Sequence, residues 1–234
     1  AFSFFETIHA AAYSYLNDVL GLDEYEEFIN DPVAIKKVET FFSSYSDKVS
    51  LAVFSGAGEG VSLFSSFSVL LSFNRDGRYK GLAQIISWSA LDEQQHSEGG
   101  CKLFRRLVEE TGLSASEEKA IYHGFELVVD NEMKFIDNIF ASATLPSIDK
   151  EELKSYIKNR ANERLLLLGL NSLFKLTTEE LTQAKSIAAW FDPTVKGASS
   201  NDFFAQTKDG GNYVAKVSQD FMSVDLTSLD LAFT

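Results

Sequence analysis

Several residue types are scarce in this 234-residue chain, and each scarcity excludes a class of protein. Cys101 is its only cysteine, so no internal disulfide can form, and a reducing cytoplasm is the simplest compartment. Lys and Arg number 21 against 34 Asp and Glu, and the net charge of −13 argues against partners such as nucleic acid or an anionic membrane. No uninterrupted apolar run approaches the roughly 18–20 residues of a membrane span, and we find no signal peptide.

Proline is also scarce, with 3 copies against 20 of Phe, and no segment shows the alternation of a β-strand. The sequence therefore predicts an all-α protein with long helices around an aromatic interior. Gly21, Gly112 and Gly169 are predicted to end helices, and Ser114 with Glu117 forms the capping-box pattern of a helix start. We expect helices over residues 1–20, 33–44, 47–74, 79–111, 114–143 and 149–168, and a short last one within 177–191.

The composition divides the chain into two parts. Residues 1–192 carry the helical pattern, whereas residues 193–234 are rich in Gly, Ser, Thr and Asp with isolated aromatics. We expect the second part to be a flexible tail. Its last apolar residues are spaced like anchors for a partner's groove; alternatively, they are incidental in a solvated tail. They are Leu226, Leu229, Leu231 and Phe233.

Two Glu-x-x-His pairs and one further glutamate are candidate metal ligands. Glu6 with His9 and Glu93 with His96 lie three residues apart, so each pair shares one face of a helix. Glu59 stands among small and apolar residues. A single pair is more often a solvated helix face, but two pairs plus a glutamate match much of the ligand set of a ferritin-like dimetal bundle. Carboxylates and imidazoles suit iron or manganese.

Tyr13 follows His9 by four residues, which places it one turn further along the same face. In an aromatic core such a tyrosine is usually packing. Beside two metal ions it could instead lose an electron and a proton. His123 lacks a comparable glutamate partner, and we expect it to be structural.

Three stretches are similar to the ligand helices of the small, radical-generating subunit of class I ribonucleotide reductase: "ETIHAAAYSYL", "GEGVSLF" and "DEQQH". The 34-residue interval from Glu59 to Glu93 also resembles the family, and "NDFFAQTKDGGNYVAKV" resembles its C-terminal segment. The likeness spans nearly the whole chain. It implies an all-α, ferritin-like helical bundle with a dimetal carboxylate site and a flexible C-terminal tail.

The resemblance implies roles for particular residues. It implies that Tyr13 holds a stable radical, that Asp92 bonds His9 on the electron and proton route, and that Tyr213 is a mobile relay. It also implies that Leu63 and Phe67 line an apolar pocket around the radical. The implied ligands of the two metal ions, with iron favoured and manganese or a mixed pair as alternatives, are Glu6, His9, Glu59, Glu93 and His96.

The resemblance further implies a homodimer whose tail docks on a large catalytic subunit. The family takes its first metal ligand from a helix upstream of Glu6, where this chain has only "AFSFF". We therefore expect a fragment, or a split protein whose separate N-terminal chain supplies the sixth ligand. Two alternatives stay open: a different ferritin-like dimetal oxidase or oxygenase, which would need neither Tyr13 nor the tail, and a non-enzymatic metal-binding relative.

Overall fold

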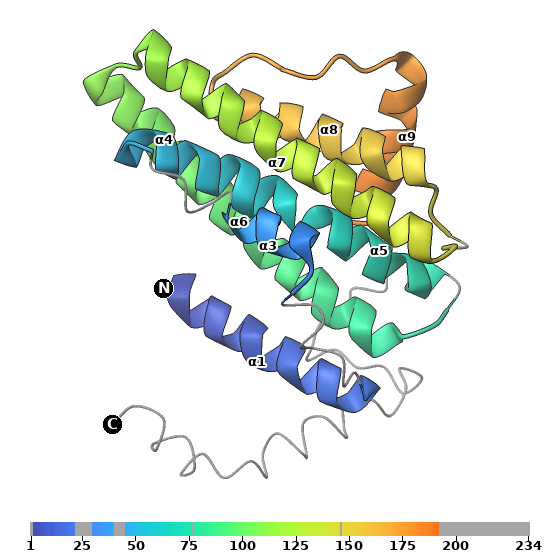
Figure 1. Cartoon of the computed structure of the whole chain (residues 1–234). Helices are drawn as coiled ribbons and strands as arrows, with labels where there is room; N and C mark the ends of the chain where they lie inside the picture. Colours follow the sequence, from blue (N-terminus) through green and yellow to red (C-terminus); the bar gives the residue numbers. More distant parts are fainter. Residues whose placement is uncertain (1, 22–29, 40–44, 76, 146, 192–234) are drawn as a thin grey trace, which may run out of the picture. The chain divides into compact units, whose positions relative to one another are not determined.

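All regular secondary structure in the described part of the chain is helical, which confirms the all-α prediction. The computed structural model describes residues 2–21, 30–39, 45–75, 77–145 and 147–191. In chain order the elements are α1 (Phe2–Leu20), α3 (Pro32–Glu39), α4 (Asp47–Ala52), the π-helix η2 (Val53–Ser62), α5 (Phe64–Arg75), α6 (Lys80–Thr111), α7 (Ala115–Ser142), α8 (Lys150–Leu167) and α9 (Thr178–Ala188) (Figure 1). The predicted tail, residues 193–234, lies outside the described residues, as does the predicted end of the second helix, residues 40–44.

The local signals in the sequence set the helix ends. The three glycines that were expected to end helices all adopt positive φ, at 63° for Gly21, 73° for Gly112 and 84° for Gly169. Only glycine reaches this region without steric cost. The predicted capping box is also present, because Ser114 Oγ accepts a hydrogen bond from the Glu117 N–H while the Glu117 carboxylate accepts one from the Ser114 N–H.

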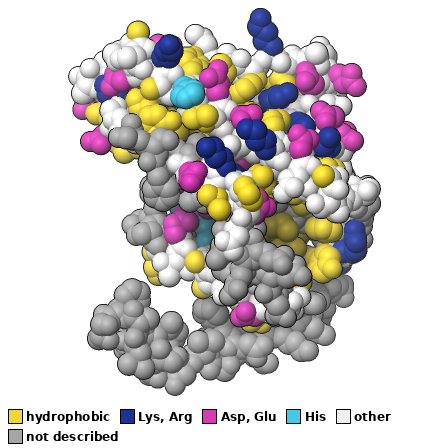
Figure 2. All heavy atoms as spheres, viewed as in Figure 1, with side chains coloured by type: hydrophobic (Ala, Val, Ile, Leu, Met, Phe, Trp, Pro, Cys, Tyr) yellow, Lys and Arg dark blue, Asp and Glu magenta, His cyan; other side chains and the backbone are white. Residues whose placement is uncertain are grey.

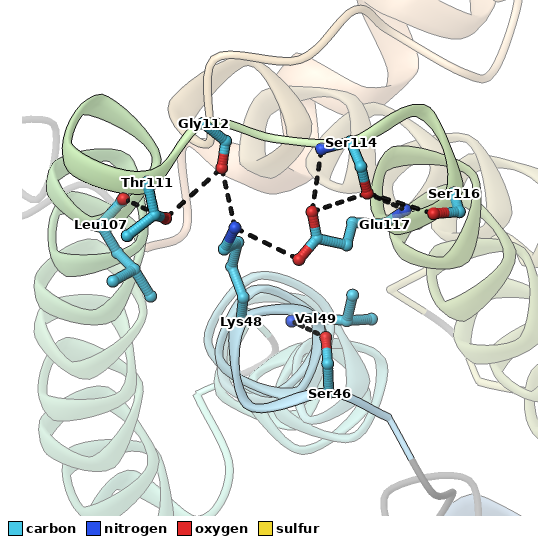
Figure 3. Close-up of polar contacts among 9 residues, drawn as sticks. All are labelled: Ser46, Lys48, Val49, Leu107, Thr111, Gly112, Ser114, Ser116 and Glu117. Atoms are coloured by element: carbon cyan, nitrogen blue, oxygen red, sulfur yellow. Dashed lines mark hydrogen bonds and ion pairs between the residues drawn. The ribbon is translucent and has the colours of Figure 1, made fainter.

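A lysine ties the start of α4 to the turn between α6 and α7 (Figure 3). Lys48 Nζ donates a hydrogen bond to the Gly112 carbonyl at 2.7 Å and lies 3.2 Å from Glu117 Oε1. The same carboxylate closes the capping box of α7, so Lys48 and Glu117 together join three helices. This arrangement fixes the turn at the end of the long helix α6.

The segment expected as one helix over 47–74 is divided into three parts, and its centre is a π-helix that the sequence did not predict. By length and composition this run, Asp47–Arg75, is the one candidate membrane span in the described part of the chain. However, 72% of its most apolar window is buried inside the protein. The segment is thus the central core helix of a bundle, and it contacts α6, α7 and α8.

Small residues let the neighbouring helices approach this central segment closely. A Cβ atom on Gly124 of α7 would lie 2.6 Å from Val53 Cγ2, and one on Gly56 would lie 2.7 Å from Phe125 Cζ. Both distances are shorter than van der Waals contact permits. Glycine at these two positions is therefore a packing requirement.

A buried ion pair braces the end of the π-helix from another side. Glu132 of α7 is fully buried, and Lys37 Nζ of α3 lies 2.7 Å from its Oε1. Ser65 Oγ donates to the same carboxylate, and Lys37 Nζ donates to the Ser62 carbonyl at 2.9 Å. Burial raises the pKa of Glu132, and Lys37 opposes that rise.

Charged side chains of both signs are interspersed on the described surface that Figure 2 shows, without a continuous basic stripe on that face.

Candidate metal centre

The first helix contributes two of the predicted ligands. Glu6 and His9 lie one turn apart on α1, with His9 buried and the Glu6 side chain 51% exposed. Because a helix brings residues i and i+3 onto one face, both side chains point to the same region. That region lies against α6, which α1 contacts.

The other predicted ligands come from η2 and α6. Glu59 lies near the end of the π-helix, and its side chain is 15% exposed. Glu93 and His96 lie one turn apart on α6, and both are buried. Three separate segments of the chain therefore supply the candidate ligands.

The ligand atoms converge on one point. One ligand atom each from Glu6, Glu59, Glu93 and His96 lies within 4.8 Å of all the others. His96 Nδ1 is 3.4 Å from Glu6 Oε1, 3.8 Å from Glu59 Oε2 and 3.4 Å from Glu93 Oε2. His9 adjoins this group, with Nδ1 at 3.2 Å from Glu93 Oε1. The structure thus brings together all five residues that were predicted as ligands.

The electrostatics of this cluster fit a bound cation. Burial, the adjacent Glu59 carboxyl and the negative charges of Glu6 and Asp92 together raise the pKa of Glu93 to about 9. Glu93 Oε2 and His9 Nδ1 are buried without a hydrogen-bond partner. Crowded carboxylates and unpartnered buried acceptors are costly unless a positive charge offsets them. A divalent metal ion would supply that charge.

Asp92 and Tyr13 both lie close to His9, one of the candidate ligands. Asp92 Oδ2 is 3.2 Å from His9 Nε2, on the opposite side of the imidazole from the atom that faces Glu93. The Tyr13 ring centroid is 6.5 Å from that of His9. Its hydroxyl is buried without a hydrogen-bond partner, and burial raises the pKa of Tyr13.

Comparison with known proteins identifies the family. The sequence profile described as "Ribonucleotide reductase, small chain" matches residues 1–181. The chain belongs to this family. One relative of this ribonucleotide reductase small chain is a probable ribonucleoside-diphosphate reductase small subunit of Invertebrate iridescent virus 6. The two sequences are 32% identical over 216 residues, which cover 73% of this chain and 60% of the viral protein. It is 25% identical over 245 residues to the ribonucleoside-diphosphate reductase subunit beta of Halalkalibacterium halodurans, covering 93% of this chain and 65% of that protein.

Solved structures share the ferritin-like fold of the family. A putative class I ribonucleotide reductase from Bacillus halodurans has a TM-score of 0.69 at 21% identity, covering 81% of this chain and 72% of that one. The dimanganese(II) NrdF of Streptococcus sanguinis has a TM-score of 0.64 at 21% identity, covering 82% and 66%. The predicted ferritin-like bundle is thereby confirmed. The chain spans about 60% of the length of the viral relatives that it matches.

One expectation for this ribonucleotide reductase small chain concerns the apolar pocket around Tyr13. The resemblance implied that Leu63 and Phe67 line this pocket. Leu63, the residue after the π-helix, is 38% exposed, whereas Phe67 is buried. Phe67 lies in the following α-helix and keeps its place in the core.

Sequence reasoning also missed two residues next to the centre. One is Arg160 of α8, which is buried. It donates hydrogen bonds to Gly60, which follows Glu59, and to the other missed residue, Gln94, which follows Glu93. Neither residue belongs to a recognisable motif, because their contacts join positions 66 to 100 residues apart. Tyr213 and the apolar residues near Phe233 lie outside the described residues, and their roles stay predictions.

Proposed function

We propose that this chain is the radical-generating small subunit of a class I ribonucleoside-diphosphate reductase, an oxidoreductase of deoxyribonucleotide synthesis. One observation carries the proposal: ligand atoms of Glu6, Glu59, Glu93 and His96 converge within 4.8 Å of one another, and Tyr13 lies on the same helix as Glu6. Family membership supports the same reading. The large subunit would bind the nucleotide.

The centre would hold two metal ions through Glu6, His9, Glu59, Glu93 and His96. These ligand types suit iron and manganese alike. We propose iron, because Tyr13 is present as an oxidisable phenol, with manganese or a mixed pair as alternatives. When bound, the metal ions would activate dioxygen and supply the one-electron oxidation of that phenol.

The surrounding residues orient the ligands and protect the phenol. The hydrogen bond between His9 Nε2 and Asp92 directs His9 Nδ1 toward the carboxylates, as an outer partner of a ligating histidine commonly does. Burial of the Tyr13 hydroxyl keeps water away from a radical formed there. The Asp92 side chain is 32% exposed, so the hydrogen bond between His9 and Asp92 connects the buried centre to the surface. An electron and a proton would pass along this connection.

The proposed partners follow from the family and from the open side of the site. The tail, residues 193–234 with Tyr213, would dock on the large catalytic subunit, and the small subunit would form a homodimer in the cytoplasm. A sixth carboxylate would complete the ligand set. The half-exposed side chain of Glu6 supports this, because one side of the ligand cluster is open to another segment.

Electron paramagnetic resonance tests the proposal. The full chain, with any polypeptide that co-purifies with it, is loaded with ferrous iron and then exposed to oxygen. We expect a tyrosyl radical in the wild type and in Tyr15→Phe, whose ring is exposed on the same helix, and none in Tyr13→Phe. A Tyr13→Phe variant that keeps the same signal would refute the assignment. Bound metal without any radical would instead favour another dimetal oxidase or a non-enzymatic metal-binding relative.

A further inference from the structure

Arg160 joins the two helical segments that carry Glu59 and Glu93. Its Nε donates to the Gly60 carbonyl at 2.5 Å, and its Nη2 donates to Gln94 Oε1 at 2.7 Å. Gly60 follows Glu59 in the chain, and Gln94 follows Glu93. Arg160 itself belongs to α8, a helix that supplies none of the predicted ligands, so its contacts are made across the core.

The surroundings of Arg160 hold the guanidinium in one position. The residue is 6% exposed, and the guanidinium carbon lies 3.2 Å from the centroid of the Phe64 ring. Gln94 Nε2 donates to Glu98 Oε1 at 2.6 Å, which turns the amide oxygen of Gln94 toward Arg160. Burial lowers the pKa of Arg160 to about 10, so the group stays charged at neutral pH.

The guanidinium of Arg160 fixes the distance between the Gly60 carbonyl and the Gln94 side chain, which it binds. Its donors form a rigid planar fork, so two acceptors bound to it keep a fixed separation. One acceptor belongs to the backbone of η2 and the other to a side chain of α6. A π-helix is rare and is frequently found at functional sites. The fork thus holds the π-helix at a set distance from α6.

We propose that Arg160 is a positioning residue for the metal centre, which sets the separation of Glu59 from Glu93 and thereby the affinity of the centre for divalent cations. This inference rests on the proposed metal site. Outer partners of metal ligands commonly change metal affinity by about 10- to 100-fold when they are removed. Arg160 acts on the ligands indirectly, through Gly60 and Gln94, the residues that follow Glu59 and Glu93.

Binding of Mn²⁺ to the full chain tests this without any catalytic readout. Free Mn²⁺ is measured by electron paramagnetic resonance under exclusion of oxygen. We expect Arg160→Met to bind about 10- to 100-fold more weakly than the wild type, Gln94→Met to change affinity in the same direction, and Arg160→Lys to restore part of the loss. Because the two side chains act through one contact, the double variant should bind no more weakly than Arg160→Met alone.

A stability control separates positioning from general loosening of the fold. Ile187 is fully buried on α9, which packs against α8, so Ile187→Ala lowers stability without touching η2 or α6 through a hydrogen bond. We expect it to keep wild-type Mn²⁺ affinity wherever circular dichroism shows it folded. Gln94→Met retains Arg160, so it provides a folded test if Arg160→Met does not fold.

The outcomes distinguish the two proposals. Wild-type affinity in both Gln94→Met and Arg160→Met would overturn the role of Arg160 and leave the metal site standing. An equal loss in Ile187→Ala would also overturn it, because affinity would then follow stability. A wild type that binds no Mn²⁺ would contradict the proposed metal site itself, and the inference with it.

Discussion

Gly124 of α7 has no side chain, and this lets α7 pack closely against the central helix. A methyl group there would lie 2.6 Å from Val53 Cγ2, at the residue where the π-helix begins. Val53 is buried and β-branched, so its side chain has little freedom to move away. Close approach of α7 to η2 therefore depends on this glycine.

Gly124→Ala should lower the free energy of unfolding by about 1–3 kcal/mol through overpacking. The matched control is Gly81→Ala, because a Cβ at Gly81 in α6 meets nothing within 4 Å. That change should raise the free energy of unfolding by about 0.5–1 kcal/mol, since alanine is the better helix former. Urea unfolding of both variants measures the difference. Equal stability of the two variants would contradict the packing argument.

Among the elements, the junction of α4, α6 and α7 includes the contact between Lys48 and the Glu117 carboxylate. Hydrogen bonds from the backbone and hydroxyl of Ser114, followed by the contact with Lys48, lower the pKa of Glu117 to about 2. A carboxylate whose folded pKa lies below its ordinary value of about 4.3 stabilises the fold above that pH. This stabilisation is lost as the pH falls from about 4.3 toward 2.

Glu117→Gln should therefore be less stable than the wild type at pH 7, with a gap that narrows as the pH falls toward 2. Unfolding in urea at pH 7, 4 and 2.5 follows the gap directly. Glu109→Gln serves as the control, because Glu109 is exposed on α6 and its carboxylate meets the exposed Arg106. A gap for Glu117→Gln that does not change with pH would show that its charge contributes nothing.

At the scale of the whole molecule, the proposed function divides the chain between the metal centre and the tail. All the predicted metal ligands lie within residues 6–96, whereas docking is assigned to residues 193–234. Deleting the last 20 or so residues should abolish reductase activity with the large subunit and leave the Tyr13 radical intact. Activity assays and electron paramagnetic resonance on one sample measure the reductase activity and the radical content of the shortened chain. Activity that survives the deletion would show that docking lies elsewhere.

The residues themselves could be predicted because their signals are local. The two Glu-x-x-His pairs, the glycine stops and the capping box of Ser114 each depend on spacings of a few residues along one helix. Helix geometry converts such spacings into shared faces whatever surrounds them. The sequence by itself therefore determined the helical class and most helix ends, and it was enough to select the five candidate ligands.

Only the tertiary structure decided how those parts meet. The π-helix that carries Glu59, the exposure of Leu63, the Lys37–Glu132 pair and the contacts of Arg160 all depend on packing between segments far apart in the chain. Such packing depends on the shape of several side chains at once, and no local spacing encodes it. The sequence supplied the chemistry of the centre, and the assembled core set the distances between its groups.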